Sequence, residues 1–299
     1  MNKPSHLKAI LLSIMVTFIW ATSWVLIKIG LNDIPAMTFA GLRYALASLL
    51  LLPFILRKNA RAEIKRLSKK DWLVLVNLGV FLYAIGQGGQ YLGLAYLPSV
   101  TVGLILNLSA LFVALTASFA IKEKPSWIQW TGVIMNLAGI MIYFFPIGNA
   151  NGSWLGWFFA VLSLVGNSMG SILGRKINKT AHISPILITA ISMTIGSILM
   201  LVTGIVWQGL PPLTITSIWI IAVLAVINTA FCFTVWNYTQ QTLSATETTI
   251  MNNTMLVYVA ILAWIFLGEK QTLQGMLGLS LAFIGALVVQ IRPKTPRAQ

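Results

Sequence analysis

The segment GLILNLSALFVALTASFAIKEK, residues 103–124, returns in altered form 146 positions later as TIMNNTMLVYVAILAWIFLGEK, residues 249–270. Asn107 of the first segment then aligns with Asn253 of the second. The same offset aligns further identical residues without a gap. The pairs are Leu97 and Leu243, Glu123 and Glu269, Lys124 and Lys270, Gly132 and Gly278, and Gly139 and Gly285. The chain therefore reads as an internal duplication, which we divide into residues 1–147 and 148–299.

The composition places this duplication in a membrane. Of the 299 residues, 58% are apolar and only 9% are charged, whereas soluble domains carry about 25% charged residues. About 20 apolar residues span the hydrocarbon as a helix. Ten stretches of the chain qualify: roughly 8–30, 36–56, 71–94, 99–121, 126–145, 153–173, 184–206, 214–236, 246–267 and 272–291.

Five of these stretches lie in each copy, and an odd number of spans turns the second copy upside down in the membrane. We therefore expect an all-α polytopic membrane protein, with ten transmembrane helices arranged as two inverted five-helix repeats. Transporters built in this way bind their substrate near the midplane, where the two copies meet.

The distribution of lysine and arginine predicts the orientation. With the N-terminus inside, the inner segments hold 17 of the 20 basic residues, and the outer loops hold Lys270 only. Segment 57–70 carries seven basic residues, and its repeat mate 203–216 carries none. We expect both termini in the cytoplasm and the basic surface on anionic lipid, so the net charge of +14 does not indicate a nucleic-acid partner.

The ninth stretch opens with ATETTIMNNT, residues 245–254, in which seven of ten residues are polar. Unpaired polar groups are costly in lipid, so this half-helix must face other helices or water. It either forms hydrogen bonds between helices or lines a substrate cavity. Because Asn107 and Asn253 are repeat mates near mid-membrane, we expect both to line the cavity.

Glu247 is the only acidic residue well inside a predicted span. Intramembrane carboxylates are functional hypotheses by default, so Glu247 is the candidate for carrying a coupling proton. It also lies in the first turn of its predicted helix, where a carboxylate stabilises the helix N-terminus. The sequence leaves both roles open.

Further predicted lining residues lie on other helices. Tyr83 and Gln87 stand among the glycines of the third stretch, and Asn167 follows Ser163 in the sixth. Trp20 of the first copy aligns with Gly166 of the second. Because a large aromatic residue in one copy corresponds to a glycine in the other, we predict an asymmetric cavity. Trp236 is either a further lining residue or an interfacial anchor.

The remaining polar residues predict little chemistry. Arg43, two turns into the second stretch, is expected to have a structural role and to pair with Asp33 or a backbone carbonyl, and anion binding is the alternative. Histidines, the single Cys232 and carboxylates form no cluster at metal-ligand spacing, and no nucleophile elbow or phosphate-binding loop occurs. We expect no cofactor, no metal, no catalytic residue and no enzymatic activity.

Several short motifs resemble a known family. They are IWATSWVLIK at 19–28, LRY at 42–44, GLAYLP at 93–98 with the following Asn107, and the helix ends Glu123-Lys124 and Gly268-Glu269-Lys270. In order and spacing the whole chain resembles ten-helix members of the EamA family of the drug/metabolite transporter superfamily. The usual Gly-Glu helix end reads Lys122-Glu123 in the first copy, a small departure.

The resemblance implies export of amino acids or related small metabolites across a bacterial inner membrane, through a central cavity lined by helices 1, 3, 4, 6, 8 and 9. We therefore expect a secondary transporter that works by alternating access, with a small-molecule substrate, a lipid bilayer and protons as partners. The alternatives are an uncoupled facilitator of the same substrates and, in a different class, a membrane scaffold or intramembrane enzyme.

Overall fold

The computed structural model describes residues 4–121, 126–145, 153–179, 183–239, 242–243 and 245–289, and all regular structure in these ranges is helical. The first half contains α1 (His6–Gly30), α2 (Ala36–Ile55), α3 (Lys58–Lys65), α4 (Lys69–Leu78), the π-helix η1 (Gly79–Gln87), α5 (Gly88–Tyr96), α6 (Ser99–Ile121) and α7 (Trp127–Phe144). The second half contains α8 (Trp154–Lys179), α9 (Pro185–Gln208), α10 (Ile215–Val223), the π-helix η3 (Leu224–Phe231), α11 (Cys232–Thr239), α12 (Ala245–Leu267) and α13 (Leu273–Val289).

Each of the ten predicted stretches coincides with one of these helices or with one continuous helical run. Within the described residues, seven helices are long and apolar enough to cross a membrane. Three shorter apolar helical segments, Ser99–Ser109, Met251–Leu267 and Leu273–Val289, fall in the other three predicted stretches. The helical, membrane-embedded class is therefore confirmed at this level.

The outer surface supports the same class. Large apolar side chains point away from the core on many helices: Trp127 is 87% exposed, Val206 82%, Ile215 78% and Met141 73%. Soluble monomers rarely expose contiguous apolar surface on this scale. These faces are accounted for by contact with lipid chains.

Two short helical segments lie where a loop was expected. The segment 57–70 contains α3, and Ala60 of α3 packs with Leu75, Ile183 and Leu187 in a small apolar cluster. Residues 174–183, which separate two predicted spans, are also partly helical, because α8 continues to Lys179 through Arg175 and Lys176. Arginine and lysine are good helix formers, so a membrane helix can extend into water through such residues.

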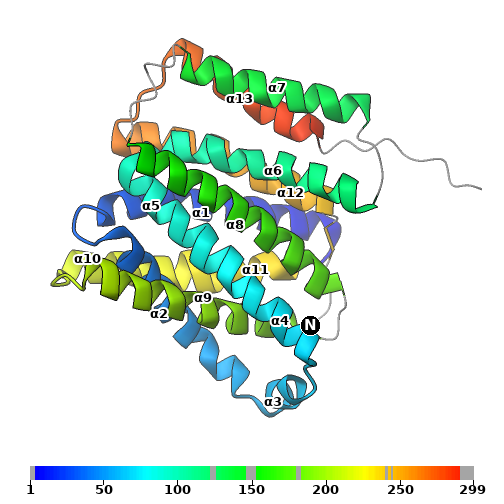
Figure 1. Ribbon diagram of the computed structural model, residues 1–299, viewed down its shortest axis with the longest axis vertical. Coiled ribbons are helices and arrows are strands. Elements are labelled where there is room, and N and C mark those ends of the chain that lie inside the picture. Colours follow the sequence, from blue (N-terminus) through cyan, green and yellow to red (C-terminus); the bar gives the residue numbers. More distant parts are fainter. Residues whose placement is uncertain are drawn as a thin grey trace, which may run out of the picture.

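Glycines let α7 and α13 pack closely at one end of the stack of helices (Figure 1). A Cβ atom added to Gly132 would lie 2.9 Å from the carbonyl oxygen of Gly285, and one added to Gly139 would lie 2.6 Å from that of Gly278. Because the partner number falls as the residue number rises, the two helices run antiparallel.

A second antiparallel pair, α2 and α9, packs in the same way. A Cβ atom on Gly41 would lie 2.5 Å from the Cα of Leu201, and one on Gly204 would lie 2.7 Å from the Cα of Thr38. The largest buried cluster lies between this pair and the helices α1, η1, α5 and η3. The core that positions the candidate site is therefore built from both halves of the chain.

The third and eighth predicted spans are each interrupted by a π-helix. The first, η1, covers Gly79–Gln87, and η3 covers Leu224–Phe231. Adding the repeat offset of 146 to the bounds of η1 gives 225–233, so the two π-helices occupy nearly equivalent positions. The π-helix is rare and occurs mostly as single-turn bulges, frequently at functional sites. Both π-helices carry buried polar or aromatic side chains, Tyr83 in η1 and Asn228 and Thr229 in η3.

Candidate functional site

A continuous row of aromatic rings crosses the core between the two π-helical spans. Tyr44 of α2 lies 5.6 Å from Tyr83 of η1, and Tyr83 lies 5.9 Å from Phe233 of α11, measured between ring centroids. Trp20 of α1 lies 5.2 Å from Phe233 and 5.0 Å from Trp236. These separations are those of favourable edge-to-face and tilted aromatic pairs. The row is an apolar, polarisable part of the core that both halves of the chain build.

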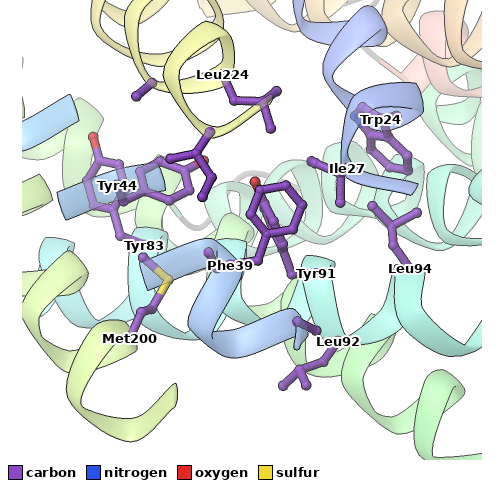
Figure 2. Close-up of a cluster of buried hydrophobic side chains, with 14 of the residues drawn as sticks. Trp24, Ile27, Phe39, Tyr44, Tyr83, Tyr91, Leu92, Leu94, Met200 and Leu224 are labelled. Carbon is purple, nitrogen blue, oxygen red and sulfur yellow. The ribbon is translucent and has the colours of Figure 1, made fainter. Parts of the chain in front are cut away.

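Figure 2 shows part of this core. The rings of Tyr44 and Tyr83 lie together at one side of it, and those of Phe39 and Tyr91 lie together near its centre. Tyr44, Tyr83 and Tyr91 are all at most 2% exposed. Buried tyrosines need hydrogen-bond partners for their hydroxyl groups, and those partners define the polar part of the site.

The hydroxyl of Tyr44 begins a chain of amide hydrogen bonds. It donates to Gln87 Oε1 at 2.8 Å, and Gln87 Nε2 donates to Asn167 Oδ1 of α8 at 3.2 Å. Asn167 Nδ2 in turn donates to the carbonyl oxygen of Ser163 at 2.9 Å, and Ser163 Oγ donates to that of Gly86 at 2.6 Å. The side chains of Gln87 and Asn167 are half-buried. This chain of hydrogen bonds joins α2, η1 and α8 beside the aromatic row.

Trp20 connects the aromatic row to the second π-helix. Its indole Nε1 donates to the carbonyl oxygen of Asn228 in η3 at 2.9 Å. Asn228 Nδ2 donates in return to the backbone oxygen of Ile19 and, at 3.2 Å, to Thr22 Oγ1. The indole is therefore held in one orientation between α1 and η3.

Trp20 of α1 packs on the second π-helical span, and the equivalent contact in the second half, between Gly166 of α8 and η1, is very different. Gly166, its repeat mate, lies so close to η1 that an added Cβ atom would be 2.5 Å from the backbone nitrogen of Gly86. The helices α8 and η1 therefore touch through their backbones, whereas a tryptophan ring lies between α1 and the η3–α11 run. This difference agrees with the asymmetry predicted from the alignment of Trp20 with Gly166.

Arg43 of α2 lies beside this group and is 3% exposed. Its Nε donates to Thr229 Oγ1 of η3 at 2.7 Å, and a terminal nitrogen donates to the hydroxyl of Tyr91 in α5 at 3.0 Å. The guanidinium carbon also lies 5.1 Å from the centroid of the Tyr44 ring. The expected partners, Asp33 or a backbone carbonyl, are therefore replaced by two hydroxyl groups and a ring.

The structure thus brings together Trp20, Tyr83, Gln87, Asn167 and Trp236 of the predicted lining residues. Asn107 belongs to a different contact: its Oδ1 accepts from Asn136 Nδ2 of α7 at 3.0 Å, and Asn136 Nδ2 also donates to the carbonyl oxygen of Ala282 in α13 at 2.7 Å. Asn253 is 5% exposed, and its Nδ2 has no partner among the described residues. The described hydrogen bond of Asn107 is therefore with α7 rather than with the aromatic and amide group.

Glu247 lies in the first turn of α12, as expected, but its side chain is outside the part of the chain that the structure describes. The described residues also contain no group of three or more His, Cys, Asp or Glu side chains that could hold a metal ion. The group of side chains described above is suited to binding a ligand through ring faces, amides and one guanidinium.

Sequence reasoning missed Tyr44, Phe233 and Thr229 as members of the site. A signal for two of them was present, because Thr229 and Phe233 are the repeat mates of Tyr83 and Gln87. Tyr44 follows Arg43 in the motif LRY at 42–44, which indicates the family but not a role in the site. Its contact with Gln87 depends on how α2 and η1 are rotated against each other, which no sequence pattern gives.

Comparison with known proteins agrees with this architecture. The model of the EamA-like transporter family matches twice, over residues 7–145 and 154–291. The chain belongs to the EamA-like transporter family. This membrane transporter is 24% identical over 289 residues to the uncharacterized transporter YoaV of Bacillus subtilis (strain 168), covering 93% of this chain and 95% of the relative.

A second relative is named for its substrates. The S-adenosylmethionine/S-adenosylhomocysteine transporter of Chlamydia trachomatis serovar L2 is 24% identical over 279 residues, covering 90% of this EamA transporter and 84% of the relative. Among solved structures, one crystal structure superimposes with a TM-score of 0.69 at 16% identity, covering 94% of this chain and 96% of the other. That likeness concerns the fold alone.

Proposed function

We propose that this EamA transporter is a secondary transporter that exports small metabolites, amino acids or related compounds, by alternating access through a site between two inverted five-helix repeats. The observation that carries the proposal is that both halves of the chain contribute side chains to the site. Trp20, Tyr83 and Gln87 come from residues 1–147, and Asn167, Phe233 and Trp236 come from residues 148–299. When one half moves against the other, the contacts of a ligand that both halves hold change.

Paired contacts between α7 and α13 support the inverted repeat. Gly132 faces Gly285, and Gly139 faces Gly278. Gly278 and Gly285 are the repeat mates of Gly132 and Gly139, so exchanging the two copies turns one contact into the other. A two-fold axis between antiparallel mates has this effect. The two matches of the family model, over residues 7–145 and 154–291, support the same division of the chain into 1–147 and 148–299.

The position of the protein follows from the charge distribution. Seventeen of the 20 basic residues lie in segments on one predicted side, which we place in the cytoplasm together with both termini. The inner membrane of a bacterium is the compartment that agrees with this arrangement. The exposed apolar faces of Val206 and Ile215 would then contact its lipid chains.

The chemistry of the site supports metabolites with an aromatic or apolar part and polar ends. Aromatic rings line one side, and the half-buried amides of Gln87 and Asn167 each combine donor and acceptor groups. Amino acids have this division into a side chain and a polar end. So do S-adenosylmethionine and S-adenosylhomocysteine, the compounds that name the chlamydial relatives.

Proton coupling rests on Glu247, and the alternative is an uncoupled facilitator with the same site. None of the described carboxylates contacts the aromatic and amide group, which favours the facilitator. Purified protein in proteoliposomes decides between them. Uptake of labelled amino acids that responds to an imposed pH gradient, and loses that response in Glu247→Gln, supports coupling through Glu247. A flux that ignores the gradient leaves the facilitator.

The same vesicles test the proposal as a whole. Transport predicts that labelled substrate accumulates by exchange against unlabelled substrate inside the vesicle. A membrane scaffold would produce no exchange with any compound. Release of a chemically altered product would instead indicate an intramembrane enzyme.

A further inference from the structure

Arg43 is a buried cation whose contacts among the described residues are with neutral groups. It is 3% exposed, donates to Thr229 Oγ1 and the Tyr91 hydroxyl, and lies over the Tyr44 ring. A guanidinium stays charged and has five N–H donors in a fixed fork. Among the described residues, only two of these donors have hydrogen-bond partners.

The four acidic side chains that the structure describes are placed elsewhere. Glu63 accepts from the backbone nitrogen of Ser184, Asp71 caps α4 through Ser68, and Glu269 accepts from the backbone nitrogens of Ser99 and Val100. Asp33 is exposed, whereas Arg43 is buried. Glu247 begins α12 at the predicted cytoplasmic side, and Arg43 lies two turns from the opposite, outer end of α2.

An ionised side chain inside a membrane protein is expensive without a counter-ion, and it marks a ligand or ion pathway more often than a packing contact. The partners of Arg43 are hydroxyl groups, which can turn and accept or donate as a ligand requires. A carboxylate matches the fork of a guanidinium with two parallel hydrogen bonds. Among the described residues Arg43 therefore has no counter-ion, and a ligand can bring one.

Two routes of direct contact connect Arg43 with the aromatic row. Thr229, which accepts from Arg43, is next in η3 to Asn228, whose carbonyl oxygen accepts from Trp20. Tyr44, next to Arg43 in α2, leads through Tyr83 and Phe233 to the same Trp20 ring. One small molecule could place a ring on the aromatic row and a charged end on Arg43.

We propose that the substrate carries a carboxylate and that Arg43 recognises it. The inference rests on the proposed function and narrows it, because it names the group that every good substrate shares. A purely structural Arg43 would tie α2, α5 and η3 together and would treat acids and their amides alike. Selectivity between the two therefore separates recognition from packing.

The test uses the full-length protein in proteoliposomes and pairs each of the L-amino acids, and S-adenosylmethionine, with its carboxyl amide. The free acid is expected to exchange about tenfold or more faster than its amide, because a charge-assisted hydrogen bond is lost in the amide. In Arg43→Gln this preference is expected to fall close to one. Arg43→Lys keeps the charge without the fork and should retain a reduced preference.

The comparison of acids with their amides in the wild-type protein tests the inference even if Arg43→Gln fails to fold. Equal exchange of acids and amides by the wild-type protein contradicts the carboxylate inference and leaves the transporter intact. A preference that persists unchanged in a folded Arg43→Gln also contradicts it. Absence of exchange for every compound in the panel contradicts the proposed function and the inference together.

Discussion

Gln87 of η1 donates a hydrogen bond from Nε2 to Asn167 Oδ1 of α8 at 3.2 Å, joining residues 80 positions apart and in different halves of the chain. Gln87 Oε1 also accepts from the Tyr44 hydroxyl at 2.8 Å, so the amide is fixed at both ends. The amide of Gln87 therefore links the two halves of the chain.

The first prediction concerns this amide. Gln87→Ala removes the bond between halves and leaves the buried Tyr44 hydroxyl without its acceptor, so we expect exchange in proteoliposomes to fall by about tenfold or more. Asn77→Ala is the matched control, because Asn77 is half-buried and its described hydrogen bond is to the backbone of Leu73 in its own helix. Equal exchange rates for the two variants would remove Gln87 from the site.

The second prediction concerns the packing of α7 on α13. A Cβ atom at Gly139 would meet the backbone of α13, 2.6 Å from the carbonyl oxygen of Gly278, so Gly139→Ala should destabilise the detergent-solubilised protein by about 1–3 kcal/mol. At Gly174 the nearest atom would be a side-chain carbon of Leu78 at 3.8 Å, so Gly174→Ala should be neutral or slightly stabilising. Unfolding followed by denaturant measures both, and a Gly139→Ala protein as stable as Gly174→Ala would argue against the close contact.

The third prediction concerns the two repeat-mate asparagines. We expect Asn107→Leu and Asn253→Leu to lower exchange while leaving expression intact, because both are buried polar groups near the predicted midplane. Asn107→Leu should cost more stability, since Asn107 Oδ1 accepts from Asn136 and Asn253 Nδ2 has no described partner. Normal exchange by both variants would place the cavity away from them.

The fourth prediction concerns topology. Single cysteines at Ala62 and Leu210, both exposed, are introduced after Cys232→Ala has removed the native thiol. In intact cells an impermeant thiol reagent should label position 210 and spare position 62, because the basic segment 57–70 lies inside. Labelling of both positions from outside would contradict the orientation.

The sequence predicted the elements better than their contacts. Hydropathy placed the ten long apolar helical runs but not the polar helix α3, because a lipid solvent demands long apolar helices whatever their packing. The offset of 146 also identified Trp20 and Gly166 as a contrasting pair, and the structure places a ring at one and a backbone contact at the other. Such features follow from composition and alignment.

The partners of Arg43 and Asn107 could not be obtained in this way. Thr229 lies 186 positions from Arg43, and Asn136 reaches Asn107 only because α6 and α7 present particular faces to each other. The π-helices η1 and η3 were not predicted either, since apolar periodicity does not distinguish one added residue in a long span. Rotation and register of helices, which set these contacts, depend on packing in three dimensions.

The measurement that tests the central claim most directly is exchange by the wild-type protein beside two tryptophan variants. Trp20→Ala removes the indole that packs in a tilted arrangement against Phe233 and Trp236, and Trp219→Ala removes a tryptophan on the outer surface that is 67% exposed. Transport through the site between the repeats predicts exchange in the wild-type protein and Trp219→Ala and a loss of about tenfold or more in Trp20→Ala. Exchange by Trp20→Ala at the wild-type rate would contradict the account.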